Sequence, residues 1–182
     1  MKKERFEAIT DAVLAIIITL MVLEIKIPEL TLDNLSIVFQ QVLIYGVSFV
    51  CIAILWLNHH HIFVKVEKVP INIVWINFAL LFFTSLLPKA TEHLSSNFHQ
   101  VANHIFFGLT MAIITFLYSL IEMFVMKQSN RVDQKADRRN WISVVLWLLS
   151  VLLCFVNLYL SSAIFVLLPI IYFLVSKKEI QQ

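Results

Sequence analysis

Residues 5–25 read RFEAITDAVLAIIITLMVLEI, an apolar run long enough to cross a bilayer as one helix. A spanning helix needs roughly 20 predominantly apolar residues. This run nevertheless carries Arg5 at its start and Asp11 about a turn and a half further along. An ionisable side chain inside a membrane helix is costly, so it usually marks a polar site that faces protein or water. Beyond Asp11 the run is aliphatic, with Thr19 as its main polar interruption.

The remaining chain is equally apolar. Hydrophobic residues make up 60% of the 182 residues, charged residues 14%, and there are only two glycines. A soluble domain of this size could not cover so much apolar surface with so few charges. Continuous apolar runs also argue against a membrane barrel, whose strands alternate over about ten residues. The sequence predicts an all-α polytopic membrane protein that forms a single domain over residues 1–182.

Six transmembrane helices are predicted from the apolar runs and the prolines that bound them. Pro28 follows the first run, Pro70 precedes the third and Pro88 ends it. A tight turn at 157–162 predicts that the last two helices form a hairpin. The expected spans are Ala8–Ile27, Leu35–Leu57, Ile71–Leu87, Val101–Met126, Trp141–Tyr159 and Ser162–Val175.

Lysine and arginine are distributed very unevenly between the two sides of these spans. One side would hold twelve of them: Lys2, Lys3, Arg5, Lys65, Lys68, Lys127, Arg131, Lys135, Arg138, Arg139, Lys177 and Lys178. The other side would hold only Lys26 and Lys89. Positive residues remain in the cytoplasm, so both termini are expected there. The basic residues thus indicate orientation next to anionic lipid, and nucleic acid is not expected as a partner.

An aliphatic row follows one face of the first helix. Its members, spaced alternately four and three residues apart, are Ile9, Val13, Ile16, Leu20, Leu23 and Ile27. One interpretation is a packing seam against a neighbouring helix. The other is a pore wall, in which symmetry-related copies would stack rings of isoleucine and leucine. The spacing alone does not choose between them.

Asp11 lies about 140° around the helix from Ile16, so it should point sideways toward other helices. Its expected partner is the end of the second span, where residues 56–61 read WLNHHH. Three consecutive histidines fan out by about 100° each and cannot converge on one ion, so no metal site is expected. A histidine bonded to a buried Asp11 carboxylate is the preferred interpretation.

Catalytic signatures are absent from the sequence. It contains no Gly-x-Ser-x-Gly, no glycine-rich phosphate loop and no His-Glu-x-x-His, so neither an enzyme nor a cofactor is expected. Glu24 and Glu122 lie near the ends of their helices, where long side chains are expected to reach the membrane interface.

Arg5 and Asp11 also match a known signature. The pattern Arg-x-x-x-Phe-Ser-Asp, continued by an aliphatic helix, is typical of the transmembrane protein 175 family, and Ile9 and Thr10 depart from it conservatively. That family comprises the endosomal and lysosomal potassium channels and their prokaryotic relatives. The second span resembles the family in a run that includes Trp56, Asn58, His59 and His60.

This resemblance implies a potassium-permeable channel in the plasma membrane of a prokaryote. Prokaryotic members have one six-helix unit per chain, assemble as homotetramers in the lipid bilayer and contain no pore loop. The first helix lines their pore, which implies a constriction at Ile16, further layers at Leu20 and Leu23, and a contribution of Thr19 to potassium preference. A structural polar network is then expected to fix this helix, formed by Arg5, Thr10, Asp11, Trp56, Asn58, His59 and His60.

Two other functions remain open. A secondary, proton-coupled transporter would titrate Asp11 together with the His59–His61 cluster. Such carriers commonly contain internal repeats, and none is visible in the sequence. A membrane assembly factor without transport activity is the third possibility.

Overall fold

The computed structural model describes all residues except 27, 30, 65, 67, 129–133 and 181–182, and for 134–137 and 173–180 it describes the backbone alone. The described chain is built from α-helices, which confirms the all-α prediction. Their bounds are α1 (Lys3–Leu23), α2 (Leu35–Phe63), α3 (Ile71–Thr84), α4 (Leu87–Ser96), α5 (Val101–Gln128), α6 (Gln134–Leu153) and α7 (Leu158–Ile180), with a 3₁₀ turn at Leu32–Asn34 before α2.

Four helical stretches are long and apolar enough to cross a membrane: Lys3–Leu23, Leu32–Phe63, Ile71–Ser96 and Val101–Gln128. The third of them joins α3 and α4, so the described helices make six stretches. The expected end of this span at Leu87 is wrong, because the chain restarts a helix there and continues to Ser96. Pro88 lies in the first turn of α4, where its missing N–H is tolerated, but it cannot bond back to the carbonyl of Thr84, so α3 ends there.

Other boundaries also differ from those expected. Helix α2 continues past Leu57 to Phe63, and α6 begins at Gln134, before Trp141. Helix α1 begins at Lys3 and ends at Leu23, so it starts before Ala8. The last hairpin turns at 154–157, because the Asn157 carboxamide oxygen accepts the backbone N–H of Tyr159 (2.8 Å) and starts α7 at Leu158. This N-cap places the turn several residues earlier than the sequence interpretation did.

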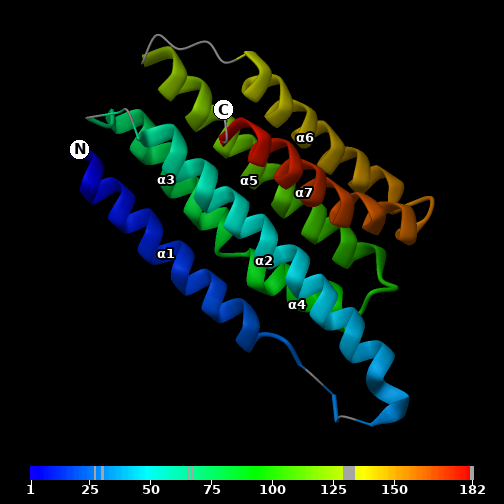
Figure 1. The fold of residues 1–182 in the computed structure, drawn as a ribbon. Helices are drawn as coiled ribbons and strands as arrows, with labels where there is room; N and C mark the ends of the chain where they lie inside the picture. Colours follow the sequence, from blue (N-terminus) through cyan, green and yellow to red (C-terminus); the bar gives the residue numbers. More distant parts are fainter. Residues whose placement is uncertain (27, 30, 65, 67, 129–133, 181–182) are drawn as a thin grey trace.

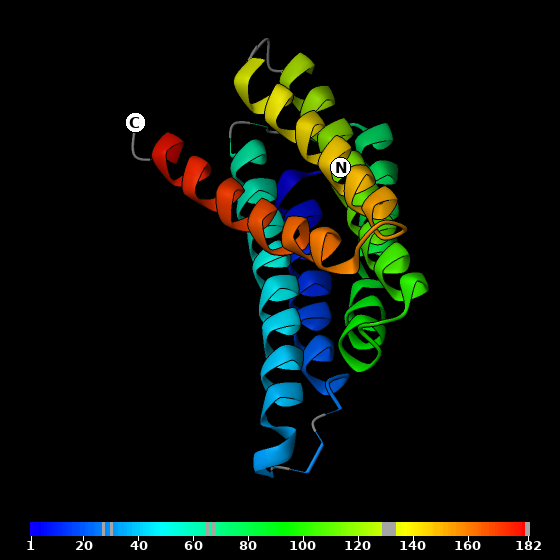
Figure 2. The same ribbon diagram turned by 90° about the vertical axis from the view of Figure 1, so that its right-hand side faces the viewer.

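The helices form an elongated bundle with α1 at one edge and α6 at the other (Figure 1). Helix α5 packs against α3, α4 and α6. Helices α1 and α2 run side by side, whereas α7 crosses α2 obliquely (Figure 2). As a result, α1 has neighbours on one side only, and this exposes the row of residues that the sequence singled out.

Candidate pore face and its polar contacts

Helix α1 has one buried and one exposed face. The buried face consists of Phe6, Thr10, Leu14, Ile17 and Met21, spaced three or four residues apart. The exposed side carries most of the predicted row: the exposed fractions are 40% for Ile9, 57% for Ile16, 47% for Leu20 and 78% for Leu23. Val13 is half-buried, and Ile27 lies outside the described residues. The row is therefore not a packing seam within one chain.

Thr19 lies exposed on the same side of α1 as Ile16 and Leu20. Its hydroxyl donates to the backbone carbonyl of Ile16 (2.8 Å). Because a hydroxyl has two acceptor lone pairs, the Thr19 oxygen can still accept a bond or contact a cation. The exposed face thus combines aliphatic side chains with one polar oxygen.

The buried face is held by a chain of hydrogen bonds that joins three helices. Asn77 of α3 donates through Nδ2 to the Thr10 hydroxyl (2.8 Å), which itself donates to the carbonyl of Phe6 (3.1 Å). The Asn77 Oδ1 is then the acceptor for His59 of α2, whose Nε2 lies 3.0 Å away. Thr10, Asn77 and His59 are each at most 2% exposed. The three side chains satisfy one another where water could not.

Asp11 makes a different contact from the one expected. Its carboxylate is exposed in the single chain and accepts the indole N–H of Trp56 (2.8 Å). His60 lies one turn further along α2, and its Nδ1 is 3.5 Å from Glu7 Oε1, one turn back along α1. The expectation of a histidine bonded to a buried Asp11 carboxylate is therefore wrong. Asp11 lies on the flank of α1, where the antiparallel α2 presents Trp56.

The three consecutive histidines point apart. His59 faces Asn77, His60 faces Glu7, and His61 is exposed. Among the residues that the structure describes, no group of three histidine, cysteine, aspartate or glutamate side chains could hold a metal ion. Successive helical residues diverge by about 100°, which accounts for this arrangement.

The remaining members of the predicted polar network lie elsewhere. Arg5 is exposed and forms no hydrogen bond or ion pair within the described part of the chain. Asn58 faces away from α1 and donates to the Tyr172 hydroxyl of α7 (3.1 Å). The structure therefore divides the expected network into a buried Thr10–Asn77–His59 chain, a flanking Asp11–Trp56 contact and a separate contact at Asn58.

Several polar side chains of the bundle were not assigned a role from the sequence. Asn77 and Tyr172 are two of them; a buried asparagine in an apolar helix is itself a signal of a functional or bonded site. Glu122 is only 4% exposed and accepts the side-chain amide of Asn140, so its expected position at the membrane interface is wrong.

A charged cluster lies at the C-terminal end of α1, the end away from Arg5. Glu92 of α4 is 5% exposed, and its carboxylate oxygens lie 3.1 Å from the ammonium groups of Lys26 and Lys89. Lys89 also lies 3.5 Å from Glu24, which follows α1 directly. Two lysines therefore compensate the buried carboxylate, and one of them ties α4 to the end of α1.

The chain is similar to known membrane channels over most of its length. A family model described as the endosomal/lysosomal potassium channel TMEM175 matches residues 5–88. A protein of Chryseobacterium named a potassium channel is 32% identical, over 98% of this chain and 96% of its own length. The chicken protein named endosomal/lysosomal proton channel TMEM175 is 32% identical over 67% of this chain, which corresponds to 27% of its own length.

A solved structure has the same fold. The crystal structure of a lysosomal potassium-selective channel TMEM175 homolog from Chamaesiphon minutus superposes with a TM-score of 0.82 at 25% identity. The match covers 95% of this chain and 97% of that chain. These relatives are named as channels and not as enzymes.

Proposed function

The chain belongs to the TMEM175 family, and on this premise we propose that it is a potassium-permeable channel. A bacterial relative of matching length is named a potassium channel. The solved structure of the Chamaesiphon minutus homolog, described as a potassium-selective channel, has the same fold. The observation that carries the proposal is the exposed aliphatic face of α1, centred on Ile16.

This face is better suited to a pore than to lipid. Arg5, Asp11 and Thr19 are exposed on the same helix as the aliphatic row. Ionisable side chains of membrane helices almost always face a bundle interior or a water-filled cavity, because exposure to hydrocarbon is costly. If four copies of the chain surround a common axis with α1 innermost, these groups face water or protein. A homotetramer with both termini in the cytoplasm is therefore part of the proposal.

In this assembly Ile16 forms the narrowest ring, with Leu20 and Leu23 as further layers and Thr19 between them. An aliphatic ring offers an ion no replacement for its hydration shell, so an ion that passes it must shed some water. Potassium binds its water less tightly than sodium and therefore crosses at lower cost. Selectivity produced in this way should be modest, because the ring supplies no coordinating carbonyls.

The proposal is tested by reconstituting the protein in planar bilayers under opposed potassium and sodium gradients. We expect Ile16→Ala to raise the unitary conductance, and Ile16→Asn to lower the potassium-to-sodium permeability ratio, since a wider or more polar ring requires less dehydration. Ile171→Ala on α7 is the matched control, because Ile171 is exposed to the same extent (58% against 57%). Unchanged permeation in both Ile16 variants, measured on an active wild type, would refute the proposed pore.

The subunit number is tested separately by crosslinking the purified protein. Bands at multiples of 21.1 kDa that end at four subunits are expected. A ladder that ends at two, or a monomer alone, would contradict the proposed tetramer.

Proton transport is the second candidate, because vertebrate relatives are named proton channels. A proton-coupled transporter would use Asp11 with His59–His61. The same recording under a pH gradient distinguishes the potassium channel from the proton-coupled transporter. The transporter gives a slow, saturable flux that Asp11→Asn abolishes. A channel gives unitary currents that persist in this variant.

A further inference from the structure

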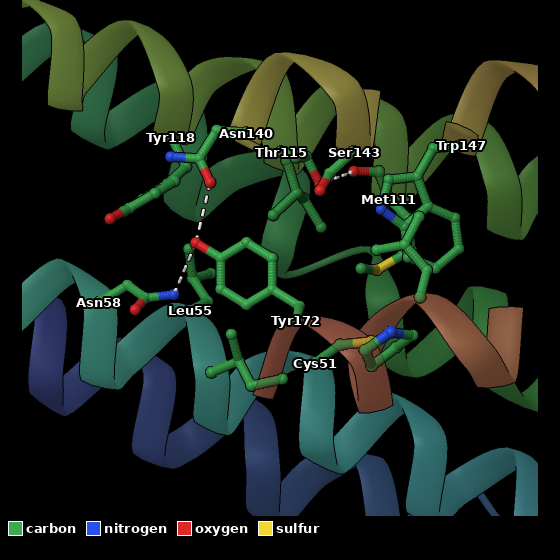
Figure 3. A pocket seen from close by; sticks show the side chains of 14 residues that line it. Cys51, Leu55, Asn58, Met111, Thr115, Tyr118, Asn140, Ser143, Trp147 and Tyr172 are labelled. Atoms are coloured by element: carbon green, nitrogen blue, oxygen red, sulfur yellow. Dashed lines mark hydrogen bonds between the residues drawn. The ribbon is translucent and has the colours of Figure 1, made fainter. Parts of the chain in front are cut away.

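A second polar junction lies on the side of α2 that faces away from α1. The buried Tyr172 hydroxyl accepts hydrogen bonds from Asn58 Nδ2 (3.1 Å) and from Arg139 (3.3 Å), and it donates to Asn140 Oδ1 (2.8 Å). Figure 3 shows the hydroxyl between Asn58 and Asn140. Asn140 in turn donates to Glu122. One hydroxyl, with both acceptor positions and its donor in use, thus joins α2, α6 and α7 and connects to α5.

This junction is next to the polar chain that holds α1. Asn58 and His59 are consecutive residues of α2, so their side chains diverge by about 100° and reach different neighbours. Asn58 reaches Tyr172, whereas His59 reaches Asn77 and, through it, Thr10 of α1. At this level α2 is therefore hydrogen-bonded to α7 on one side and to α3 on the other, and Asn77 of α3 is hydrogen-bonded to α1.

The α7 side of the junction has room to move. Pro169 precedes Tyr172 by three residues and cannot donate to the carbonyl of Phe165, which weakens α7 at this point. A cavity of about 70 Å³ borders Pro169 and Tyr172 on one side and Cys51 and Leu55 of α2 on the other (Figure 3). This cavity is partly open to the surface, so the side chains that line it have space beside them into which they can shift.

We propose that Tyr172 is a positioning residue for the pore helix. Its bond to Asn58 fixes α2, and α2 fixes the inner half of α1 through His59, Asn77 and Thr10. Two distant sites are coupled through rigid, hydrogen-bonded helices when one of these helices has two discrete arrangements. The position of α7 then biases the equilibrium between open and closed pore without touching the ion path. This inference rests on the proposed channel function, and it assigns to α7 a regulatory role in that function.

The test compares Tyr172→Phe, Asn58→Leu and the double variant in single-channel recordings. Both single variants lose the Asn58–Tyr172 hydrogen bond, and Tyr172→Phe also loses the bonds of the hydroxyl to Arg139 and Asn140. Loss of the shared bond is expected to change the ratio of open to closed times about two- to tenfold, with the same sign in both single variants. The double variant should change it no further than the larger single effect. Conductance and reversal potential should stay at wild-type values. Tyr118→Phe is the control, because Tyr118 lines the same cavity and is outside the Tyr172–Asn58–His59 path.

A second measurement does not depend on current. Ala8 is exposed near the inner end of α1, and the two native cysteines, Cys51 and Cys154, are buried. An Ala8→Cys protein should therefore react with a thiol reagent at one site. We expect Tyr172→Phe to change its reaction rate at least twofold, and Tyr118→Phe to leave the rate unchanged.

The two measurements separate the inference from the proposed function. If the wild type carries no potassium current but the Ala8→Cys rate responds to Tyr172→Phe, the channel proposal fails and the mechanical coupling stands. If the wild type conducts and neither the open-to-closed ratio nor the rate differs between Tyr172→Phe and Tyr118→Phe, the inference is overturned. A change in conductance or reversal potential with Tyr172→Phe also overturns it, because Tyr172 would then act on the ion path.

Discussion

At the scale of single residues, the carboxamide of Asn77 connects α1 to both α2 and α3. Asn77 donates to Thr10 and accepts from His59, with both distances at or below 3.0 Å. Both partners are buried. Removing the amide leaves His59 Nε2 without its hydrogen-bond partner and leaves the Thr10 hydroxyl with only its bond to the Phe6 carbonyl. The sequence pointed to Thr10 and His59, but the residue that joins them lies 67 positions from one and 18 from the other.

We therefore expect Asn77→Leu to lower the free energy of unfolding by about 1 to 3 kcal/mol, the range for an unsatisfied buried group. The measurement is the thermal unfolding midpoint of the protein purified in detergent. Thr10→Ser keeps the hydroxyl and should lie closer to the wild type. Equal midpoints for Asn77→Leu and the wild type would contradict the bonding described.

At the scale of helices, α1 has a buried and an exposed face, because helical periodicity places its residues alternately on the two. Phe6, Leu14 and Met21 pack inward, whereas Ile16 and Leu20 point outward. Composition does not distinguish the inward-packing residues from the outward-pointing ones, since both sets are apolar. Only the position of α2, α3 and α4 on one side of α1 distinguishes them.

The two glycines of the chain allow a matched test of helix packing. A Cβ on Gly108 of α5 would lie 2.7 Å from Val151 Cγ2 and 3.4 Å from Ser150 Oγ, both on α6. We expect Gly108→Ala to destabilise the protein by about 1 to 3 kcal/mol, because it forces α5 and α6 apart. Gly46 of α2 has nothing within 4 Å of the same position, so Gly46→Ala should be neutral or stabilise by up to about 1 kcal/mol.

Thermal unfolding of the two glycine variants side by side checks this difference. Each variant is the control for the other, because both introduce the same methyl group into a membrane helix. Similar midpoints for Gly108→Ala and Gly46→Ala would mean that α5 and α6 do not approach each other as closely as described.

At the scale of the whole molecule, the strongest prediction from the sequence is its orientation. The lysine and arginine asymmetry predicts that both termini and the α2–α3 connection lie in the cytoplasm. Glu29→Cys, in the exposed segment before α2, should then react with a membrane-impermeant thiol reagent added to intact cells. Val64→Cys, 51% exposed at the other end of α2, should react only after lysis. The reverse pattern would invert the proposed topology.

The sequence by itself determined the class of the molecule. Hydropathy runs show membrane helices, because the bilayer excludes unpaired backbone and charge whatever the fold. The Arg5–Asp11 signature indicated the family, which the comparisons confirm. The helix ends were harder to predict from the sequence. The restart of a helix at Pro88 and the Asn157 cap depend on local hydrogen bonding, which a hydropathy pattern does not describe.

Only the tertiary structure decided which of these residues meet. It left Ile16 and Leu20 uncovered, gave Asp11 the indole of Trp56 instead of a histidine, and turned Asn58 toward Tyr172, 114 residues away. The physical reason is that helical periodicity places a side chain on a face, whereas its partner is set by how distant helices pack. In a bundle where almost every face is apolar, sequence pattern cannot tell a face that contacts a neighbour from one that is exposed.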